Sequence, residues 1–260
     1  MSENDELQGF SLLLAQAAGH AILPHFRQPI TVDNKLESGW DPVTAGDKDA
    51  ETIIRALIEK QYPTHGIIGE EFGTKKGNSA YTWVLDPIDG TRAFVIGMPT
   101  WVTLIGLYKD GKPHMGVMCQ PFVGDIFFGG PQGSFLQREE KRTAITCAKP
   151  KPLAKALAGT TSPHLFKNET VIHALRQKVQ LLRYGGDAYF FSLVAAGHLD
   201  IAVDAGLQIY DVAALIPIIR GAGGIIAAWD GGDESQGGNI LAASCPALFE
   251  QAKTILNGEA

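Results

Sequence analysis

Apolar positions in the first part of the chain recur at intervals of three and four residues, the spacing of one helix face. This pattern predicts a helix over residues 6–26 and a second helix over residues 47–61, where Tyr62 and Pro63 stop it. Further along, short segments rich in β-branched and aromatic residues are separated by Gly, Pro and Asp, which is typical of strands. The predicted strands are GIIGEE, YTWVLD, WVTLIGLYKDG, KPHMGVMCQP and DIFFGG. The first half therefore has the pattern of an α+β structure.

Strands and helices alternate after the charged stretch REEKR at 138–142. The predicted strands there are LAGTTS, QLLRY, LDIAVDAG, IIAAWDG and NILAAS. The predicted helices are residues 164–178, DAYFFSLVAAG, YDVAALIPIIRGAGG and the C-terminal segment. Such alternation is typical of a sheet covered by helices, so we predict an α/β fold. We divide it into two parts, 1–141 and 142–260, which should pack tightly around one cleft because no Pro-, Gly- and Ser-rich linker separates them.

The composition is typical of a soluble globular protein and disfavours several partners. The chain has 260 residues, 45% of them hydrophobic, and a net charge of −6, so it lacks the excess of Lys and Arg that nucleic-acid grooves need. Its three cysteines are scattered, as in a reducing compartment. The acidic start is unlike a secretory signal, and no apolar run approaches the roughly 20 residues of a membrane span. We therefore expect a cytoplasmic protein without nucleic-acid or membrane partners.

Acidic residues stand where three predicted strands end, and side chains at such positions project into clefts. Glu70 and Glu71 end the first strand, Asp86 and Asp89 flank a turn after the second, and Asp211 precedes a helix. Each taken alone has a plain explanation, as a solvated pair, a turn or a helix N-cap. Four acids brought to one point would repel one another strongly, and bound divalent cations are the ordinary relief.

All of these candidate ligands are oxygen donors, which favours Mg²⁺ over Zn²⁺, with Mn²⁺ or Ca²⁺ able to occupy the same site. Carboxylate-bound Mg²⁺ serves chiefly phosphate chemistry, because the metal neutralises oxyanions and supplies hydroxide at neutral pH. If a helix begins at Gly90-Thr91-Arg92, its amides and the guanidinium can receive a phosphate. Two other classes stay open on this reasoning: a glycosidase with paired acids, and a noncatalytic Mg²⁺- or Ca²⁺-binding protein.

Taken together, the acidic motifs resemble those of the inositol-monophosphatase superfamily of Mg²⁺-dependent phosphatases. The resemblance covers nearly the whole chain and rests on DPVTAGD at 41–47, GEE at 69–71, WVLDPIDGT at 83–91, and YDVAAL at 210–215 with GAGG at 221–224. It implies a layered αβαβα sandwich with the metal cleft between its halves. It also implies a homodimer, because members are commonly dimeric. The family usually has Trp where this chain has Tyr210.

The resemblance further implies a set of metal ligands. Glu70, Asp86 and the backbone carbonyl of Ile88 would hold a first Mg²⁺. Asp86, Asp89 and Asp211 would hold a second. Glu70 would also help to hold a third, weaker ion, so two or three ions per site are expected.

Roles in catalysis also follow from the resemblance. Glu70 would orient the attacking water, and Thr91, coupled to Asp47, would help to activate it. The phosphate would lie across the metals and the amides of Gly90 and Thr91, so that the water attacks in line. The residues expected to bind the substrate are Asp86, Gly90, Thr91, Arg92, Asp187, Asp204 and Asp211.

Four segments are most similar to the histidinol-phosphate phosphatase branch: DPVT at 41–44, DGTRAF at 89–94, AAGHLD at 195–200 and YDVAALIPII at 210–219. Asp187 and Asp204 are expected to face the organic part of the ester, and two carboxylates suit cationic histidinol better than a neutral polyol. Asp187 has an equally simple explanation as a helix cap. We predict hydrolysis of L-histidinol phosphate in histidine biosynthesis. Inositol 1-phosphate is the alternative substrate, and nucleotide 3′-phosphates and fructose 1,6-bisphosphate are less favoured.

Overall fold

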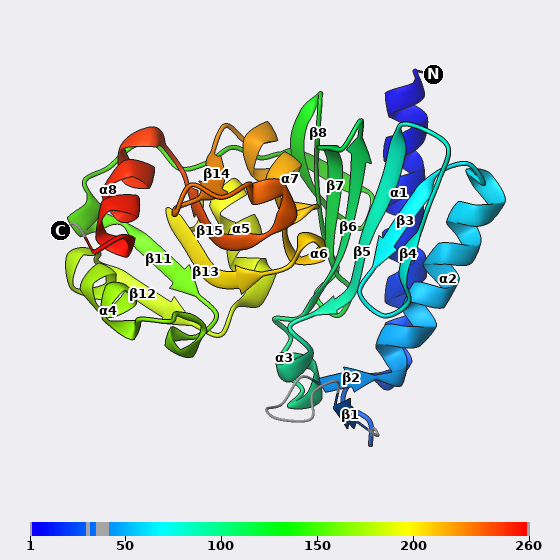
Figure 1. Cartoon of the computed structure of the whole chain (residues 1–260), viewed down its shortest axis with the longest axis horizontal. Helices are drawn as coiled ribbons and strands as arrows, with labels where there is room; N and C mark the ends of the chain where they lie inside the picture. The colour runs from blue at the N-terminus through cyan, green and yellow to red at the C-terminus, as the bar shows by residue number, and fades with distance from the viewer. Residues whose placement is uncertain (1, 30–31, 35–41, 259–260) are drawn as a thin grey trace.

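Helices and sheets are stacked in alternating layers (Figure 1). The computed structural model of the chain describes residues 2–29, 32–34 and 42–258, so Asp41 of the DPVTAGD motif lies outside the described residues. From one end to the other, the layers are α1 (Glu3–Ile22) with α2 (Ala45–Gln61), an eight-stranded sheet, α5 (Asp187–Ala195) with α6 (Ile209–Val212) and α7 (Leu215–Gly221), a five-stranded sheet, and α4 (Glu169–Lys178) with α8 (Pro246–Leu256). The expected αβαβα sandwich is confirmed.

The first sheet has the strand order β10-β9-β8-β7-β6-β5-β3-β4, and only the β3–β5 pair is parallel. Its strands in chain order are β3 (Gly66–Gly69), β4 (Gly73–Lys75), β5 (Tyr81–Asp89), β6 (Val102–Lys109), β7 (Lys112–Gln120), β8 (Asp125–Gly130), β9 (Gly133–Arg138) and β10 (Lys141–Ala144). The sequence pattern missed β4 and the β9–β10 hairpin. The expected boundary between residues 141 and 142 falls inside β10, which pairs with β9 and so belongs to the first sheet.

The second sheet has the order β12-β11-β13-β15-β14, with β11 parallel to both of its neighbours. Its strands are β11 (Leu157–Thr160), β12 (Leu181–Tyr184), β13 (Ile201–Leu207), β14 (Ile225–Ala228) and β15 (Gly238–Ala243). A separate pair, β1 (Val32–Asn34) and β2 (Pro42–Thr44), precedes α2. The short helical segments are η1 (Leu23–His25), α3 (Thr91–Val95), η2 (Leu153–Lys155), η3 (Pro163–Leu165) and η4 (Glu234–Gln236).

Helix ends follow the local capping chemistry more closely than the apolar periodicity. Ser2 caps α1, which therefore starts before the predicted residue 6 and ends ahead of Pro24. Asn168 caps α4, so that helix begins at 169 and not at 164. The helix predicted over 210–224 is two helices, α6 and α7. Pro217 explains the break, because it has no N–H for the carbonyl of residue 213 and its ring clashes with that carbonyl.

Three apolar clusters fill the interfaces between the layers, and the second cluster covers both faces of the α5–α7 layer. Burying one such side chain fully contributes about 1.5–3 kcal/mol, so these interfaces hold the layers at fixed positions. The interface between the first sheet and the α5–α7 layer matters most for function, since it joins the helices of the second half to the sheet of the first. Fully buried members of the three clusters are Leu14, Ile54 and Trp83; Leu104, Val212 and Ile218; and Ile201, Leu241 and Leu248.

Candidate metal and active site

Two aspartates at the end of β5 share one face because the strand bulges between them. From Asp86 to Asp89 the chain advances three residues, while the paired strand β6 advances only two. In a regular strand, residues three apart point to opposite faces, and the extra residue of a bulge cancels that alternation. The carbonyl of Pro87 within the bulge accepts a hydrogen bond from Thr103 Oγ1 at 2.7 Å. The DPID sequence thus aims both carboxylates at the same space.

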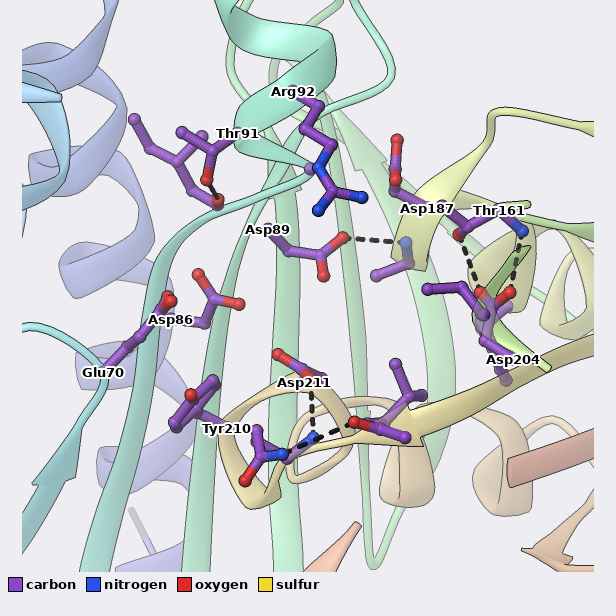
Figure 2. A pocket seen from close by; sticks show the side chains of 18 of the residues that line it. Glu70, Asp86, Asp89, Thr91, Arg92, Thr161, Asp187, Asp204, Tyr210 and Asp211 are labelled. Atoms are coloured by element: carbon purple, nitrogen blue, oxygen red, sulfur yellow. Dashed lines mark hydrogen bonds between the residues drawn. The ribbon is translucent and has the colours of Figure 1, made fainter. Parts of the chain in front are cut away.

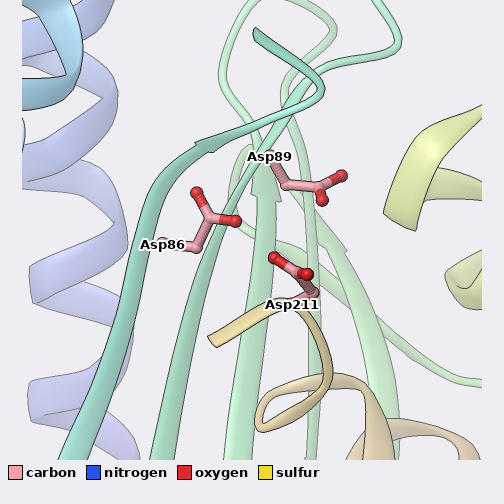
Figure 3. Close-up of side chains that lie close together, drawn as sticks. All are labelled: Asp86, Asp89 and Asp211. Carbon is pink, nitrogen blue, oxygen red and sulfur yellow. The ribbon is translucent and has the colours of Figure 1, made fainter. Parts of the chain in front are cut away.

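Asp211 reaches this space from the second half of the chain, at the start of α6. Its Oδ2 accepts a hydrogen bond from the backbone N–H of Gln208 at 2.7 Å, as the third helical residue of a capping box. The N-cap is Gln208, so the explanation of Asp211 as the N-cap is wrong, although its carboxylate does help to cap α6. The carboxylate nevertheless faces Asp86 and Asp89 across the interface between the layers (Figure 3).

A row of glycines sets how deeply α6 and α7 lie on the first sheet. Gly106, Gly116 and Gly129 are in register on the neighbouring strands β6, β7 and β8. The helix backbones lie directly on this row, which the sequence analysis overlooked, although glycines inside strands signal close backbone approach. Added Cβ atoms at these three positions would lie 2.6 Å from Ala213 Cβ, 2.1 Å from the Ala214 carbonyl oxygen and 2.2 Å from Ile218 Cα.

Asp86, Asp89 and Asp211 form a compact cluster, with one carboxylate oxygen of each within 4.8 Å of the others (Figure 3). Asp86 is 2% exposed, and its Oδ1 has no hydrogen-bond partner among the described residues. Burial, together with the charges of Glu70, Asp89 and Asp211, holds the pKa of Asp86 well above its ordinary value. Burial also raises the pKa of Asp211 to about 7. A buried carboxylate among like charges is the arrangement that a bound cation stabilises.

Glu70 and Ile88 complete the predicted ligand set around one pocket. Glu70 lies in the turn between β3 and β4, and its backbone N–H donates to the carbonyl of Leu85 on β5 at 3.1 Å. The Ile88 carbonyl accepts a hydrogen bond from Thr91 Oγ1 at 3.0 Å and has a second lone pair. Carboxylate and carbonyl oxygens are the donors that Mg²⁺, Mn²⁺ and Ca²⁺ take, so the residues fit the expected ions.

Asp47 is 1% exposed in the first turn of α2. Its Oδ2 accepts hydrogen bonds from the N–H and the Oγ1 of Thr44, at 2.8 and 2.6 Å. Burial raises the pKa of Asp47 to about 7, and the charges of Glu71 and Glu70 add to the effect. The Thr91 hydroxyl donates to the backbone carbonyl described above and not to Asp47. Coupling between Thr91 and Asp47 stays a prediction.

The Gly90-Thr91-Arg92 segment does lead into a helix, the short α3, through a left-handed Gly90 with φ of 81°. A Cβ at Gly90 would lie 3.1 Å from the Asp187 carboxylate, so the turn packs against the start of α5. Arg92 is exposed and lines the pocket. Burial raises the pKa of Asp187 to about 6, while the positive charge of Arg92 opposes that rise. The structure thus places Arg92, which was expected to bind the phosphate, close to Asp187, which was expected to face the organic part of the ester.

Asp187 begins α5 with φ of 46°, a left-handed conformation that side-chain-bearing residues rarely adopt. The next two residues are anchored to the first sheet. The Ala188 N–H donates to Asp89 Oδ2 at 2.8 Å, and the Tyr189 hydroxyl donates to Asp125 Oδ2 at 2.6 Å. These bonds hold the strained residue at a defined place on the pocket wall.

Asp204 lies on β13 at the far wall of the pocket and is 2% exposed (Figure 2). Its Oδ1 accepts hydrogen bonds from Thr160 Oγ1 and the Thr161 N–H, both at 2.7 Å, and its Oδ2 accepts one from Thr161 Oγ1 at 2.8 Å. Burial raises the pKa of Asp204 to about 7 against the opposing effect of these bonds. Neither threonine stands out in the sequence, because only folding brings them to Asp204.

The pocket has a volume of about 380 Å³ and takes its walls from both halves of the chain (Figure 2). All predicted metal and substrate residues line it, whereas Asp47 is not among the described lining residues. The lining also includes three apolar residues that were not predicted from the sequence and that could contact the organic part of an ester: Leu165, Phe191 and Leu207. A phosphate ester could therefore place its charged end at the carboxylate cluster and its organic end against β13 and α5.

Comparison with known proteins gives consistent matches over the whole chain. A model described as the inositol monophosphatase family matches residues 3–257. The chain is 38% identical over 234 residues to the bifunctional phosphatase IMPL2 of Arabidopsis thaliana, covering 88% of this chain and 66% of that protein. It is 33% identical over 267 residues to the histidinol-phosphatase of Mycobacterium tuberculosis, covering 99% of each. A solved inositol monophosphatase from Zymomonas mobilis superposes with a TM-score of 0.86 at 36% identity, covering 99% of this chain and 100% of that one.

Fold, carboxylate cluster and matches together define a metal-dependent phosphomonoesterase. The chain belongs to the inositol monophosphatase family. Family membership excludes the two other classes that the carboxylates alone left open, which are a glycosidase and a noncatalytic metal-binding protein. Within the part of the chain that the structure describes, no helix is both long and apolar enough to span a membrane.

Proposed function

We propose that this enzyme hydrolyses L-histidinol phosphate to L-histidinol and phosphate. One observation carries the proposal: the pocket wall opposite the carboxylate cluster is itself acidic, with Asp187 and Asp204 on it. A leaving group with an ammonium and an imidazole is attracted to such a wall, and a neutral polyol is not. Relatives named histidinol-phosphatase, at 31% to 33% identity, support the same choice.

We propose Mg²⁺ as the cation, two or three ions per site, held by Glu70, Asp86, Asp89, Asp211 and the Ile88 carbonyl. When bound, Mg²⁺ would neutralise the phosphate oxyanions and supply hydroxide at neutral pH. The chain itself orients the reactants. Glu70 orients the attacking water, and Thr91 with Asp47 assists its deprotonation. The amides of Gly90 and Thr91 and the Arg92 guanidinium receive the phosphate.

Inositol 1-phosphate is the second candidate substrate, and the hydrogen bonding of the acidic wall favours it. Both oxygens of Asp204 already accept hydrogen bonds, and the charge of Asp187 is partly offset by Arg92. A wall whose charge is reduced in this way discriminates less against hydroxyl groups. Relatives named inositol-1-monophosphatase are 30% identical to this chain.

Steady-state kinetics with both esters in the presence of Mg²⁺ test the assignment. We expect kcat/KM to be at least about tenfold higher for L-histidinol phosphate, which corresponds to about 1.4 kcal/mol of selective stabilisation. Asp187→Asn should reduce this preference, because it removes the charge while Asn tolerates the left-handed backbone. Equal or reversed preference in the unmodified enzyme would defeat the assignment. Loss of all hydrolysis in EDTA checks the metal requirement.

We further propose that the enzyme is a cytoplasmic homodimer in histidine biosynthesis. Light scattering after gel filtration should give twice the chain mass of 27.9 kDa. A mass equal to that of one chain would contradict the dimer. Histidine auxotrophy on deletion of the gene, relieved by histidine but not by inositol, tests the biosynthetic role.

A further inference from the structure

A fully buried glutamate on α2 faces the turn that carries Glu70. Glu51 is 0% exposed and lies one helical turn after Asp47. Its Oε2 accepts a hydrogen bond from the Glu71 N–H at 2.8 Å, and its Oε1 accepts one from the Phe72 N–H at 3.1 Å. Two successive N–H groups that hold one carboxylate form an anion-binding nest. The Glu51 side chain therefore supplies the turn with acceptors for these two backbone donors.

Arg55 lies one turn further along α2 and completes the arrangement. Its Nε donates to Glu51 Oε1 at 2.7 Å, and its Nη2 donates to the carbonyl of Gly73, where β4 begins. The ion pair offsets the cost of burying the Glu51 charge, which would otherwise be severe. The turn formed by residues 70–72 is thus tied to α2 both within the turn and just after it.

Gly69 is the residue that lets the Glu51 carboxylate approach. A Cβ at Gly69 would lie 2.0 Å from Glu51 Oε1 and 2.7 Å from Arg55 Nη2. The next residue, Glu70, is bonded on its other side, where its N–H donates to the Leu85 carbonyl at 3.1 Å. The backbone of Glu70 is therefore held between β5, which carries Asp86, and α2.

We propose that Glu51 and Arg55 are positioning residues that fix Glu70 as a metal ligand through the backbone of residues 70–72. The inference rests on the metal-binding role of Glu70 in the proposed function. Neither Glu51 nor Arg55 is among the described residues that line the pocket, so both act from behind the turn. Groups that orient a metal ligand in this way typically change metal affinity or activity by about 10–100-fold.

Calorimetric titration with Mn²⁺, in the absence of any ester, tests this directly. Glu51→Gln replaces one acceptor oxygen by an amide nitrogen that cannot accept the turn's hydrogen bonds, and we expect about 10–100-fold weaker Mn²⁺ binding. Glu59→Gln is the matched control, because Glu59 lies on the same helix, is half exposed and pairs with the Lys75 side chain at 3.1 Å. It should bind Mn²⁺ like the unmodified enzyme. Unchanged binding in Glu51→Gln, or equal losses in both variants, would overturn the proposal.

Gly69→Ala provides an independent test that needs no change of charge and decides the matter if Glu51→Gln does not fold. The added methyl group displaces the Glu51 carboxylate from the turn, so Mn²⁺ binding should weaken here as well, and wild-type binding would overturn the proposal. Glu70→Gln distinguishes a failure of the proposed metal-binding role of Glu70 from a failure of the positioning role of Glu51 and Arg55. If Glu70→Gln binds Mn²⁺ normally, the proposed role of Glu70 fails. If only Glu70→Gln is impaired, the positioning role of Glu51 and Arg55 fails alone.

Discussion

Two aspartates on opposite walls of the pocket, Asp86 and Asp204, are equally buried and differently surrounded. Each is 2% exposed. Asp86 faces three other carboxylates, and among the described residues its Oδ1 has no hydrogen-bond partner. Asp204 accepts three hydrogen bonds from Thr160 and Thr161. Hydrogen bonds within the fold stabilise the Asp204 carboxylate on the pocket wall formed by β13 (the β13 wall). The clustered carboxylates on the opposite wall, at the end of β5 (the β5 wall), need a cation to offset their charge.

Asp86→Asn should produce the largest effect, because it removes a proposed metal ligand. We expect kcat/KM with Mg²⁺ to fall by more than about 100-fold, the upper range for groups that merely orient a ligand. Thermal unfolding of the metal-free variant should be unchanged or occur at a higher temperature, since a buried like charge is gone. A loss of activity smaller than tenfold would show that the β5 wall does not depend on Asp86 for its cation.

Gly116→Ala tests whether the glycine row holds Asp211 at the correct depth. The new Cβ would lie 2.1 Å from the Ala214 carbonyl oxygen, and overpacking of this kind costs about 1–3 kcal/mol of stability. Urea unfolding should show that loss, and calorimetry should show weaker Mn²⁺ binding, as α6 moves away from β5. Gly9→Ala in α1 is the control, because its Cβ meets nothing within 4 Å. Wild-type Mn²⁺ affinity in a destabilised Gly116→Ala protein would refute the positioning argument.

The pH dependence of stability should differ between the two walls. The folded-state pKa values of Asp211 and Asp204 are raised from 3.8 to about 7, so the folded protein binds more protons than the unfolded chain between these limits. The free energy of unfolding of the metal-free protein must therefore fall as pH rises through this window, by at least about 1 kcal/mol. Mg²⁺ bound at the β5 wall should reduce the part of this pH dependence that comes from Asp211. The part that comes from Asp204 should remain. Urea titrations with Mg²⁺ and with EDTA measure both, and identical slopes would contradict the difference.

Asp204→Asn should have the smallest effect. Asparagine is nearly isosteric, and its oxygen can still accept from Thr160 Oγ1 and the Thr161 N–H, while the Thr161 hydroxyl can turn to accept from its amide. We expect the stability near neutral pH to be unchanged or higher, because the raised pKa of Asp204 means that the fold disfavours its charged form, and we expect unchanged Mn²⁺ affinity. The value of kcat/KM for L-histidinol phosphate should fall by less than about tenfold. A loss as large as that of Asp86→Asn would erase the distinction between the walls.

Much of the fold was predictable because its signals are local. The helix and strand periods and the capping residues each act within a few neighbouring residues, so α2 and the first part of β5 follow from their own sequence. The turn expected between Asp86 and Asp89 is instead a bulge within β5, which depends on pairing with β6. The β9–β10 hairpin was missed because its strand β10 is short, charged and fully exposed, so it carries no apolar pattern. The break before α7 follows from Pro217, whose effect the apolar run around it concealed.

The contacts that position the site were less predictable, since they join distant parts of the chain. Glu51 meets Glu71, and Thr161 meets Asp204. No local pattern indicates such pairs, because each polar residue alone is compatible with an ordinary surface position. Family resemblance supplied the ligand set, but it did not reveal that both oxygens of Asp204 accept hydrogen bonds while Asp86 Oδ1 has no partner among the described residues.

Anomalous diffraction from a crystal soaked in Mn²⁺ shows whether the three clustered aspartates hold a cation. We expect at least one strong peak within about 2.0–2.6 Å of oxygens from Asp86, Asp89 and Asp211, the range for hard cations on oxygen. We expect no peak at Asp204, because both of its carboxylate oxygens already accept hydrogen bonds. Absence of density between the three clustered carboxylates at saturating Mn²⁺, or a peak at Asp204 in its place, would contradict these expectations.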